Sequence, residues 1–213
     1  MPTLLHLDSS ADLTSSRSRA ITATFAEAWR GRGDDYTVVY RDLHMRPLPH
    51  LADPALHWAP ELRPPGATPA READELQRQL LDELLCADVL LIGAPLYNYS
   101  LPSTLKAWID YIHVPGVTGS FAGSPRPLEG RPAVIVTARG AVYDPGTPSQ
   151  DWDHEVPALR IVLGSALGMD VTVVTTSVTL ADFVPALAEL AERSASELAA
   201  AHREAARLGA ALG

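Results

Sequence analysis

Short apolar runs alternate with amphipathic segments along the whole chain, and this alternation limits the folds that it can adopt. Five runs have the length and apolar content of strands: Thr3–Leu7, Tyr36–Tyr40, Val89–Ala94, Ala133–Thr137 and Val171–Thr176. Between and after them, apolar residues recur every three or four positions, as on one face of a helix. Such a chain is expected to form an α/β fold with a parallel sheet and helices on both faces, because each parallel connection needs a covering element.

The expected helices follow the strands in order. They are marked by Ile21, Phe25 and Trp29, by Leu76, Leu80 and Leu84, by Leu105, Ile109 and Ile112 (with Pro102 in the first turn), by Val156–Leu167, and by an Ala-rich stretch from about Val184. Two proline-rich segments, Arg46–Pro69 and Pro115–Pro132, read as long loops. A length of 213 residues suits one domain of this class, spanning residues 1–213.

Composition excludes several classes of protein. A formal net charge of −9 argues against a general binder of nucleic acid or anionic membrane. The one cysteine, Cys86, rules out an internal disulfide or a CxxC pair, and its place between a helix and a strand predicts a buried thiol. The start MPTLLHLDSS lacks a basic leader, and no apolar run approaches the length of a membrane span, so we expect a cytoplasmic protein.

Parallel sheets of this kind bind ligands at the carboxyl ends of their strands. Three loops leave those ends, Asp8–Arg17, Pro95–Ser100 and Ala138–Trp152. The functional residues are therefore expected in these loops, although the fold alone does not specify a function.

The first loop, DSSADLTSSRSRA, leads directly into a helix. Ser10, Ser16 and Ser18 offer hydroxyls, the helix start offers backbone N–H groups, and Arg17 adds a positive charge, which together suit a phosphate. The same serines could equally be ordinary helix caps. The loop lacks the G-x-x-x-x-G-K-S/T pattern of nucleoside triphosphatases and the Cys…Arg pair of cysteine-dependent phosphatases.

The second loop carries two tyrosines, Tyr97 and Tyr99, on either side of Asn98. A flat ring could pack against these tyrosines, and the Asn98 amide could pair with the amide–imide edge of such a ring. Alternatively, the tyrosines are half-buried aromatics and Asn98 is a turn residue. In the third loop, Arg139-Gly140 places a cation beside a flexible backbone, and Tyr143, Trp152 and His154 either line a pocket or subunit contact or lie in a surface turn.

Three segments taken together resemble one enzyme family. These are LHLDSS…SRSRAITATFAEAW, PLYNYSLPSTLKAWIDYI and TARGAVYDPG…DHEVPALRIVLGSALGMDV, and they are similar to the FMN-dependent NADH-azoreductases, which are also described as NAD(P)H:quinone oxidoreductases. The resemblance covers nearly the whole chain, and its middle segment is the most specific. It implies a flavodoxin-like fold, bound FMN, NADH or NADPH as co-substrate, and a homodimer with the active site at the subunit interface.

The resemblance also implies a set of FMN contacts. Ser10, Ser16, Arg17 and Ser18 would hold the phosphate and ribityl end, Leu96, Tyr97, Asn98 and Tyr99 would meet the isoalloxazine ring, and Ala138, Arg139, Gly140 and Ala141 its pyrimidine side. Four of these positions depart from the family pattern. Leu96 replaces the usual Met, Tyr99 the usual Phe, Ala138 a common Ser, and Ala141 a common Gly.

The implied reaction is a ping-pong cycle, in which a hydride passes from NAD(P)H to flavin N5 and then to a quinone or azo compound. The cofactor carries this chemistry, so no protein nucleophile and no metal are expected. Water or Tyr143 is the candidate proton donor, ahead of His154. The backbone N–H groups near Arg139-Gly140 would stabilise the reduced flavin.

Three other functions are compatible with the sequence. One is a non-catalytic electron carrier on the same fold, and another is a biosynthetic reductase dedicated to one aromatic or N–N substrate. The third is a flavin-free binding or scaffold protein.

Overall fold

The carboxyl ends of the parallel strands define the functional side of this molecule. The computed structural model describes residues 1–213 except the side chain of Asp182. Within the described residues, five parallel strands form one sheet in the order β2-β1-β3-β4-β5. The strands are β1 (Thr3–Asp8), β2 (Thr37–Asp42), β3 (Val89–Pro95), β4 (Pro132–Ala138) and β5 (Asp170–Thr176). The chain adds β2 on one side of β1, and then β3, β4 and β5 on the other side, so the strand order switches between β1 and β3. This confirms the predicted doubly wound sheet.

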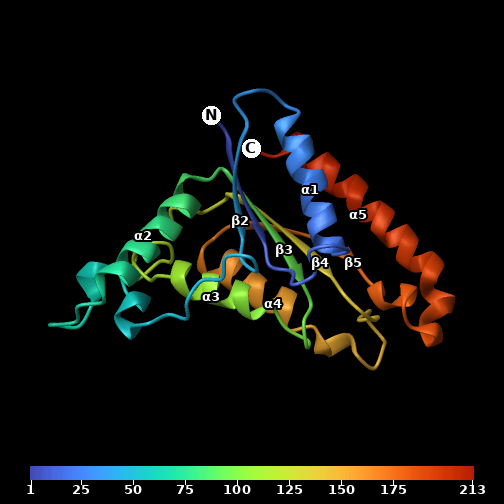
Figure 1. Ribbon diagram of the computed structural model, residues 1–213. Helices are drawn as coiled ribbons and strands as arrows, with labels where there is room; N and C mark the ends of the chain where they lie inside the picture. Colours follow the sequence, from blue (N-terminus) through green and yellow to red (C-terminus); the bar gives the residue numbers. More distant parts are fainter.

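Helices cover both faces of the sheet (Figure 1). Helices α1 (Arg17–Arg30) and α5 (Ala191–Ala211) lie on one face, and α2 (Arg71–Cys86), α3 (Ser103–Ile112) and α4 (Glu155–Leu159) lie on the other. Short 3-10 segments lie at η1 (Pro54–His57), η2 (Pro60–Leu62), η3 (Gln150–Trp152), η5 (Thr179–Asp182) and η6 (Pro185–Leu190), with a π-helical segment at η4 (Arg160–Ala166).

Close packing of α5 on α1 completes one of the two apolar layers. The buried side chains Phe25 and Trp29 point from α1 into this layer. Gly209 of α5 approaches the α1 backbone so closely that a Cβ there would lie 2.4 Å from the carbonyl oxygen of Phe25. Only glycine fits this position without a shift of the helices.

Two expected helices differ in detail from the structure. The stretch after Val184 begins as 3-10 helix, in which the N–H of Leu187 donates to the carbonyl of Val184, and α5 starts only at Ala191. The stretch Val156–Leu167 widens into π-helical geometry, in which the N–H of Leu167 donates to the carbonyl of Val162. Apolar spacing of three to four residues does not separate these variants from an α-helix. Pro102 precedes α3 at its N-cap instead of lying in its first turn.

The predicted burial of Cys86 is wrong. Cys86 ends α2 and is exposed, because the buried face of this helix consists of Gln77, Leu80, Leu81 and Leu84. Among the described residues, we find no helix with the length and apolar character needed to cross a membrane.

Candidate functional site

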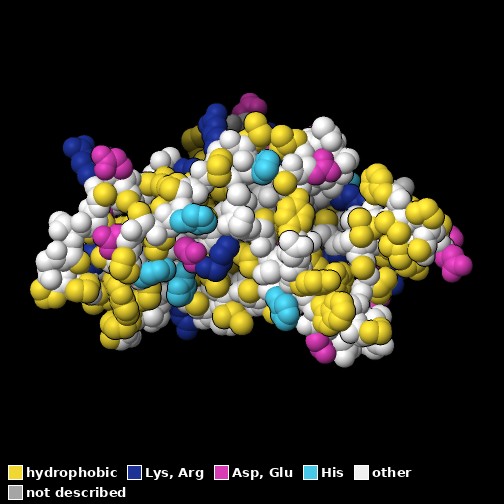
Figure 2. Space-filling view, turned by 60° about the horizontal axis from the view of Figure 1, so that its bottom comes forward, with side chains coloured by type: hydrophobic (Ala, Val, Ile, Leu, Met, Phe, Trp, Pro, Cys, Tyr) yellow, Lys and Arg dark blue, Asp and Glu magenta, His cyan; other side chains and the backbone are white. Residues whose placement is uncertain are grey.

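A cleft opens where the three predicted loops meet at the carboxyl ends of the strands, on the side of the molecule that Figure 2 brings forward. Its volume is about 470 Å³. The residues that line it are Ser10, Asp12, Ser15, Ser16, Arg17, Pro95, Leu96, Tyr97, Ala138, Gly140, Thr179, Leu180 and Phe183. All three loops therefore contribute predicted residues to one cavity.

The first loop presents the amino end of α1 to this cleft. Ser16 is the N-cap, and its Oγ accepts a hydrogen bond from the N–H of Arg19 at 3.3 Å. The partial positive charge of the helix start favours an anion at this end of the cleft. Ser18 is fully buried, and its Oγ lies 3.1 Å from Ser16 Oγ, so a hydrogen bond between the two hydroxyls helps to fix the Ser16 side chain. Arg17 donates to Ser194 Oγ of α5 at 2.8 Å.

Asp12 organises the turn before α1, a role that the sequence did not suggest. Its carboxylate accepts hydrogen bonds from the backbone N–H groups of Thr14 and Ser15, each at 2.9 Å, and from both hydroxyls of these residues. The bonds from Ser15 and then Thr14 hold the pKa of Asp12 well below its usual range. The turn is therefore fixed by a charged group that also lines the cleft.

The second loop is a tight turn with two residues in the left-handed region. Tyr97 and Ser100 exchange backbone hydrogen bonds of 2.9 and 3.0 Å, and the φ angles of Asn98 and Tyr99 are 48° and 68°. Positive φ at both central positions is the type I′ pattern, in which Asn is tolerated and an aromatic residue is strained. The carbonyl of Tyr99 accepts from the N–H of His154 at 2.9 Å, and its ring meets Trp152 edge-on at 5.5 Å.

Tyr97 connects the second loop to the first. Its hydroxyl lies 3.2 Å from Ser10 Oγ and accepts a hydrogen bond from the N–H of Ala11 at 3.0 Å. Asn98 lines a neighbouring hollow of about 430 Å³ with Ser100, Leu101, Ser103 and Lys106, and Tyr97 lines both cavities. Asn98 therefore lines a different cavity from Ser10 and Ser16, and Tyr97 borders both cavities.

The third loop holds its cation in an ion pair. Arg139 Nη2 lies 2.7 Å from Asp153 Oδ2, and both side chains are largely buried. The Arg139 guanidinium also lies 6.0 Å from the centre of the Tyr143 ring. Burial, followed by nearby charges, raises the pKa of Tyr143, so this hydroxyl keeps its proton at neutral pH.

Glu155, the first residue of α4, is a buried acid that was not among the predicted site residues. It is fully buried, and its Oε2 accepts a hydrogen bond from Thr137 Oγ1 at 2.5 Å. Burial raises the pKa of Glu155 to about 8 although the Thr137 bond opposes this, so the side chain is neutral at pH 7. A signal was available, because Glu155 stands four and eight residues before the buried Leu159 and Leu163.

The segment after β5 forms a fourth wall of the cleft. Thr179 and Leu180 donate backbone hydrogen bonds to the carbonyls of Arg139 and Gly140 at 3.0 and 3.3 Å. Leu180 packs so close to Gly140 that a Cβ on this glycine would lie 3.0 Å from Leu180 Cδ1. The predicted site loops followed β1, β3 and β4 only. Ligands bind at the carboxyl ends of parallel strands, so the segment after β5 could have been predicted by the same rule.

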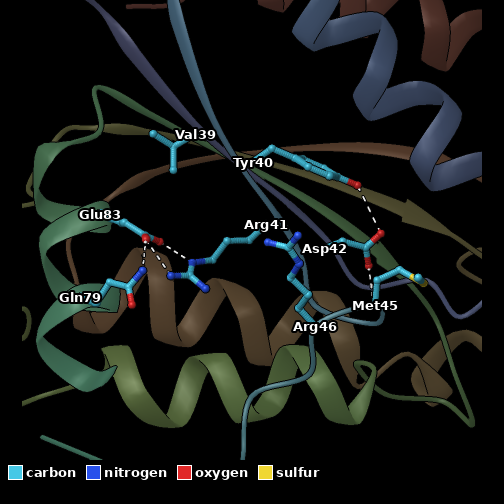
Figure 3. Close-up of a pocket in the computed structure, with 8 residues that line it drawn as sticks. All are labelled: Val39, Tyr40, Arg41, Asp42, Met45, Arg46, Gln79 and Glu83. Carbon is cyan, nitrogen blue, oxygen red and sulfur yellow. Dashed lines mark hydrogen bonds and ion pairs between the residues drawn. The ribbon is translucent and has the colours of Figure 1, made fainter. Parts of the chain in front are cut away.

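A third hollow, of about 520 Å³, lies beside the edge strand β2 (Figure 3). Arg41 pairs with Glu83 there, and Asp42 pairs with Arg19 and accepts from the Tyr40 hydroxyl. Within the described part of the chain, no three His, Cys, Asp or Glu side chains group so as to hold a metal ion.

Comparisons with family models, with curated proteins and with solved structures all match proteins of one fold. The flavodoxin-like fold family matches residues 2–206. An FMN-dependent NADH:quinone oxidoreductase of Kineococcus radiotolerans is 61% identical over 201 residues, covering 94% of this chain and 95% of the relative. A protein of the same name from Frankia casuarinae is 42% identical over 211 residues, covering 95% and 98%. The crystal structure of an azoreductase from Bacillus anthracis shares the fold, with a TM-score of 0.80, 21% identity and 99% coverage of both chains.

Proposed function

We infer the function from one premise, namely that this chain belongs to the flavodoxin-like family of FMN-dependent NADH:quinone oxidoreductases. It is an enzyme that uses FMN to reduce quinones with NADH. We propose that azo compounds are a second class of acceptor. Support for this comes from the fold that the chain shares with an azoreductase.

The observation that carries the proposed cofactor site is the cleft itself. A volume of about 470 Å³ is in the range of cofactor pockets. One end has the amino end of α1 with its serines, which suits a phosphate, and the middle is walled by Leu96 and Tyr97, which suits a flat ring. The residues of the cleft therefore fit FMN.

We propose the same contacts that the sequence resemblance implied. The phosphate and ribityl end would be held by Ser10, Ser16, Arg17 and Ser18. The ring would be held by Leu96, Tyr97, Asn98 and Tyr99, and its pyrimidine side by Ala138, Arg139, Gly140 and Ala141. Thr179 and Leu180 are further candidates, because they form the fourth wall.

When bound, FMN supplies the two-electron chemistry by which a hydride leaves NADH and a quinone is reduced. The chain's own residues bind, orient and exclude water. Arg139 is held by Asp153, so the pair adds little net charge near the cleft. We keep Tyr143 as the proposed proton donor to a reduced acceptor; its raised pKa keeps the hydroxyl protonated but makes it a weaker acid than an ordinary tyrosine.

We also propose that the enzyme is a homodimer. Two edge-on aromatic pairs, Trp58 with Phe121 and Tyr99 with Trp152, lie at the surface, and their four side chains are 38–50% exposed. Aromatic residues are enriched at interfaces, where a partner covers them. Sedimentation equilibrium should give twice the mass of the chain, and a monomer at micromolar concentration would contradict the proposal.

We expect the enzyme to act in the cytoplasm, where NADH is regenerated.

Steady-state kinetics test the proposed function. Under anaerobic conditions, protein supplied with FMN should turn over NADH continuously only when a quinone or an azo dye is present, and double-reciprocal plots at several quinone concentrations should be parallel. The matched control is the same protein stripped of flavin, which should be inactive. A protein that binds FMN but leaves NADH unoxidised would be an electron carrier, and the proposal would be wrong.

A further inference from the structure

One guanidinium group ties the first loop to the sheet, and it belongs to a residue outside the proposed FMN contacts. Arg19 lies in the first turn of α1, and its side chain is 14% exposed. Its Nε and Nη2 both donate to the carbonyl oxygen of Ser10, at 3.2 and 2.7 Å. The guanidinium therefore holds the carbonyl of the peptide that follows Ser10.

The other side of the same guanidinium is anchored on the sheet. Nη1 and Nη2 donate to the two carboxylate oxygens of Asp42, at 2.6 and 2.9 Å. Asp42 ends β2 and also accepts from the backbone N–H groups of His44 and Met45. Burial opposes ionisation, but the bonds from Arg19 and Met45 outweigh it and lower the pKa of Asp42 to about 2. The anchor is thus a fixed carboxylate at neutral pH.

A second carboxylate completes the cluster at the end of β1. Asp8 Oδ2 lies 3.8 Å from Arg19 Nη1 and accepts a hydrogen bond from the Tyr40 hydroxyl at 3.1 Å. Thr22 Oγ1 donates to the other oxygen of Asp8 at 2.9 Å. In Figure 3 the Tyr40 hydroxyl also points toward Asp42. Arg19 therefore joins the ends of two neighbouring strands to the loop that follows β1.

The geometry requires the forked shape of arginine. The bonds to Ser10 and Asp42 leave the guanidinium in different directions, and an ammonium group cannot make them together at these distances. Ser10 is 2% exposed, and its hydroxyl contacts Tyr97, so the orientation of its peptide decides where its side chain meets the cleft. Loss of the fork would free this peptide to turn.

We propose that Arg19 is a positioning residue that sets the affinity of the cleft for the phosphate of its ligand by holding the Ser10 peptide. This inference rests on the proposed FMN site. Arg19 acts through Ser10 and touches no part of the ligand. If it merely braced the fold, its loss would weaken the binding of every flavin equally.

Riboflavin has the ring and ribityl chain of FMN without the phosphate, so the ratio of the two dissociation constants isolates the phosphate end. Both constants are measured by quenching of flavin fluorescence on the purified protein. In Arg19→Met the Kd for FMN should rise about tenfold or more, while the Kd for riboflavin changes less than about twofold. Arg19→Lys should behave like Arg19→Met, since it keeps the charge and loses the fork.

Arg30→Met is the matched control, because it removes an exposed arginine from the opposite end of the same helix and should change neither constant. If Arg19→Met does not fold, Asp42→Asn weakens the anchor while Arg19 remains, and it should lower FMN affinity selectively. An equal loss for both flavins, or full recovery of FMN affinity in Arg19→Lys, would overturn the inference. Wild-type protein that binds neither flavin would overturn the proposed function together with it.

Discussion

The role of Asn98 can be separated into two parts by a pair of substitutions. Asn98 is a central residue of the Tyr97–Ser100 turn, with φ of 48°, and the Asn98 amide is also a proposed contact to the flavin ring. Asn98→Ala removes the amide and also places alanine, which has a Cβ but no polar side-chain group, in the left-handed region. Asn98→Gly removes the amide and leaves the turn unstrained.

The expected magnitudes follow from the backbone and from hydrogen bonding. An ordinary residue in the left-handed region costs roughly 1–2 kcal/mol, and Asn tolerates it better. We therefore expect Asn98→Ala to lose about 1 kcal/mol of unfolding free energy, and Asn98→Gly to stay within about 0.5 kcal/mol of the wild type. A lost amide hydrogen bond of about 0.5–1.5 kcal/mol should weaken FMN binding roughly two- to tenfold in both variants.

Urea unfolding of the flavin-free protein measures the first effect, and fluorescence titration with FMN measures the second. These measurements decide whether the Asn98 amide contacts the flavin ring, because Asn98 lines the hollow next to the cleft and not the cleft itself. If Asn98→Gly binds FMN as tightly as the wild type and is reduced by NADH at the same rate, the amide makes no contact with the ring. If Asn98→Ala is as stable as the wild type, the reasoning about backbone strain is refuted.

Three further variants probe the cap, the fourth wall and the buried acid. Ser16→Ala removes the α1 cap and should cost about 1 kcal/mol of unfolding free energy without flavin, as measured in urea. Gly140→Ala should weaken FMN binding by pushing Leu180 aside, and the added change Leu180→Ala should restore it; no recovery would contradict this contact. The pKa of Glu155 is raised by burial from 4.5 to about 8, so the unfolded state releases this proton first and wild-type stability should fall between these pH values. Glu155→Gln keeps an acceptor for Thr137 and should remove that decline, so a parallel pH profile of the two proteins in urea would count against the buried neutral acid.

The sequence predicted the sheet well because its signals are local. Each buried strand is a short apolar run, and each helix begins near a serine, a proline or a charged residue. The flavodoxin-like fold followed from the family resemblance, and the structure confirms it with the strand order β2-β1-β3-β4-β5. The exposure of Cys86 was not foreseen, because one residue at a helix end can fall on either side of the apolar stripe.

The site was predicted loop by loop, and the contacts between loops were not. The hydrogen bonds between the Tyr97 hydroxyl and the first loop join residues 86 or 87 positions apart, and no periodicity predicts such a pair. The Arg19 fork and the Arg139–Asp153 pair likewise depend on which way long side chains turn. The sequence shows which charged residues the loops contain, but only the packed structure shows which partners their side chains bind.

An anaerobic titration of the protein loaded with FMN tests the central claim most directly. One equivalent of NADH should bleach the yellow absorbance of the protein, and one equivalent of a quinone should then restore it without further NADH. A protein that stays colourless with FMN, or keeps its colour when NADH is added, would contradict the assignment of the cleft as a flavin site for hydride transfer.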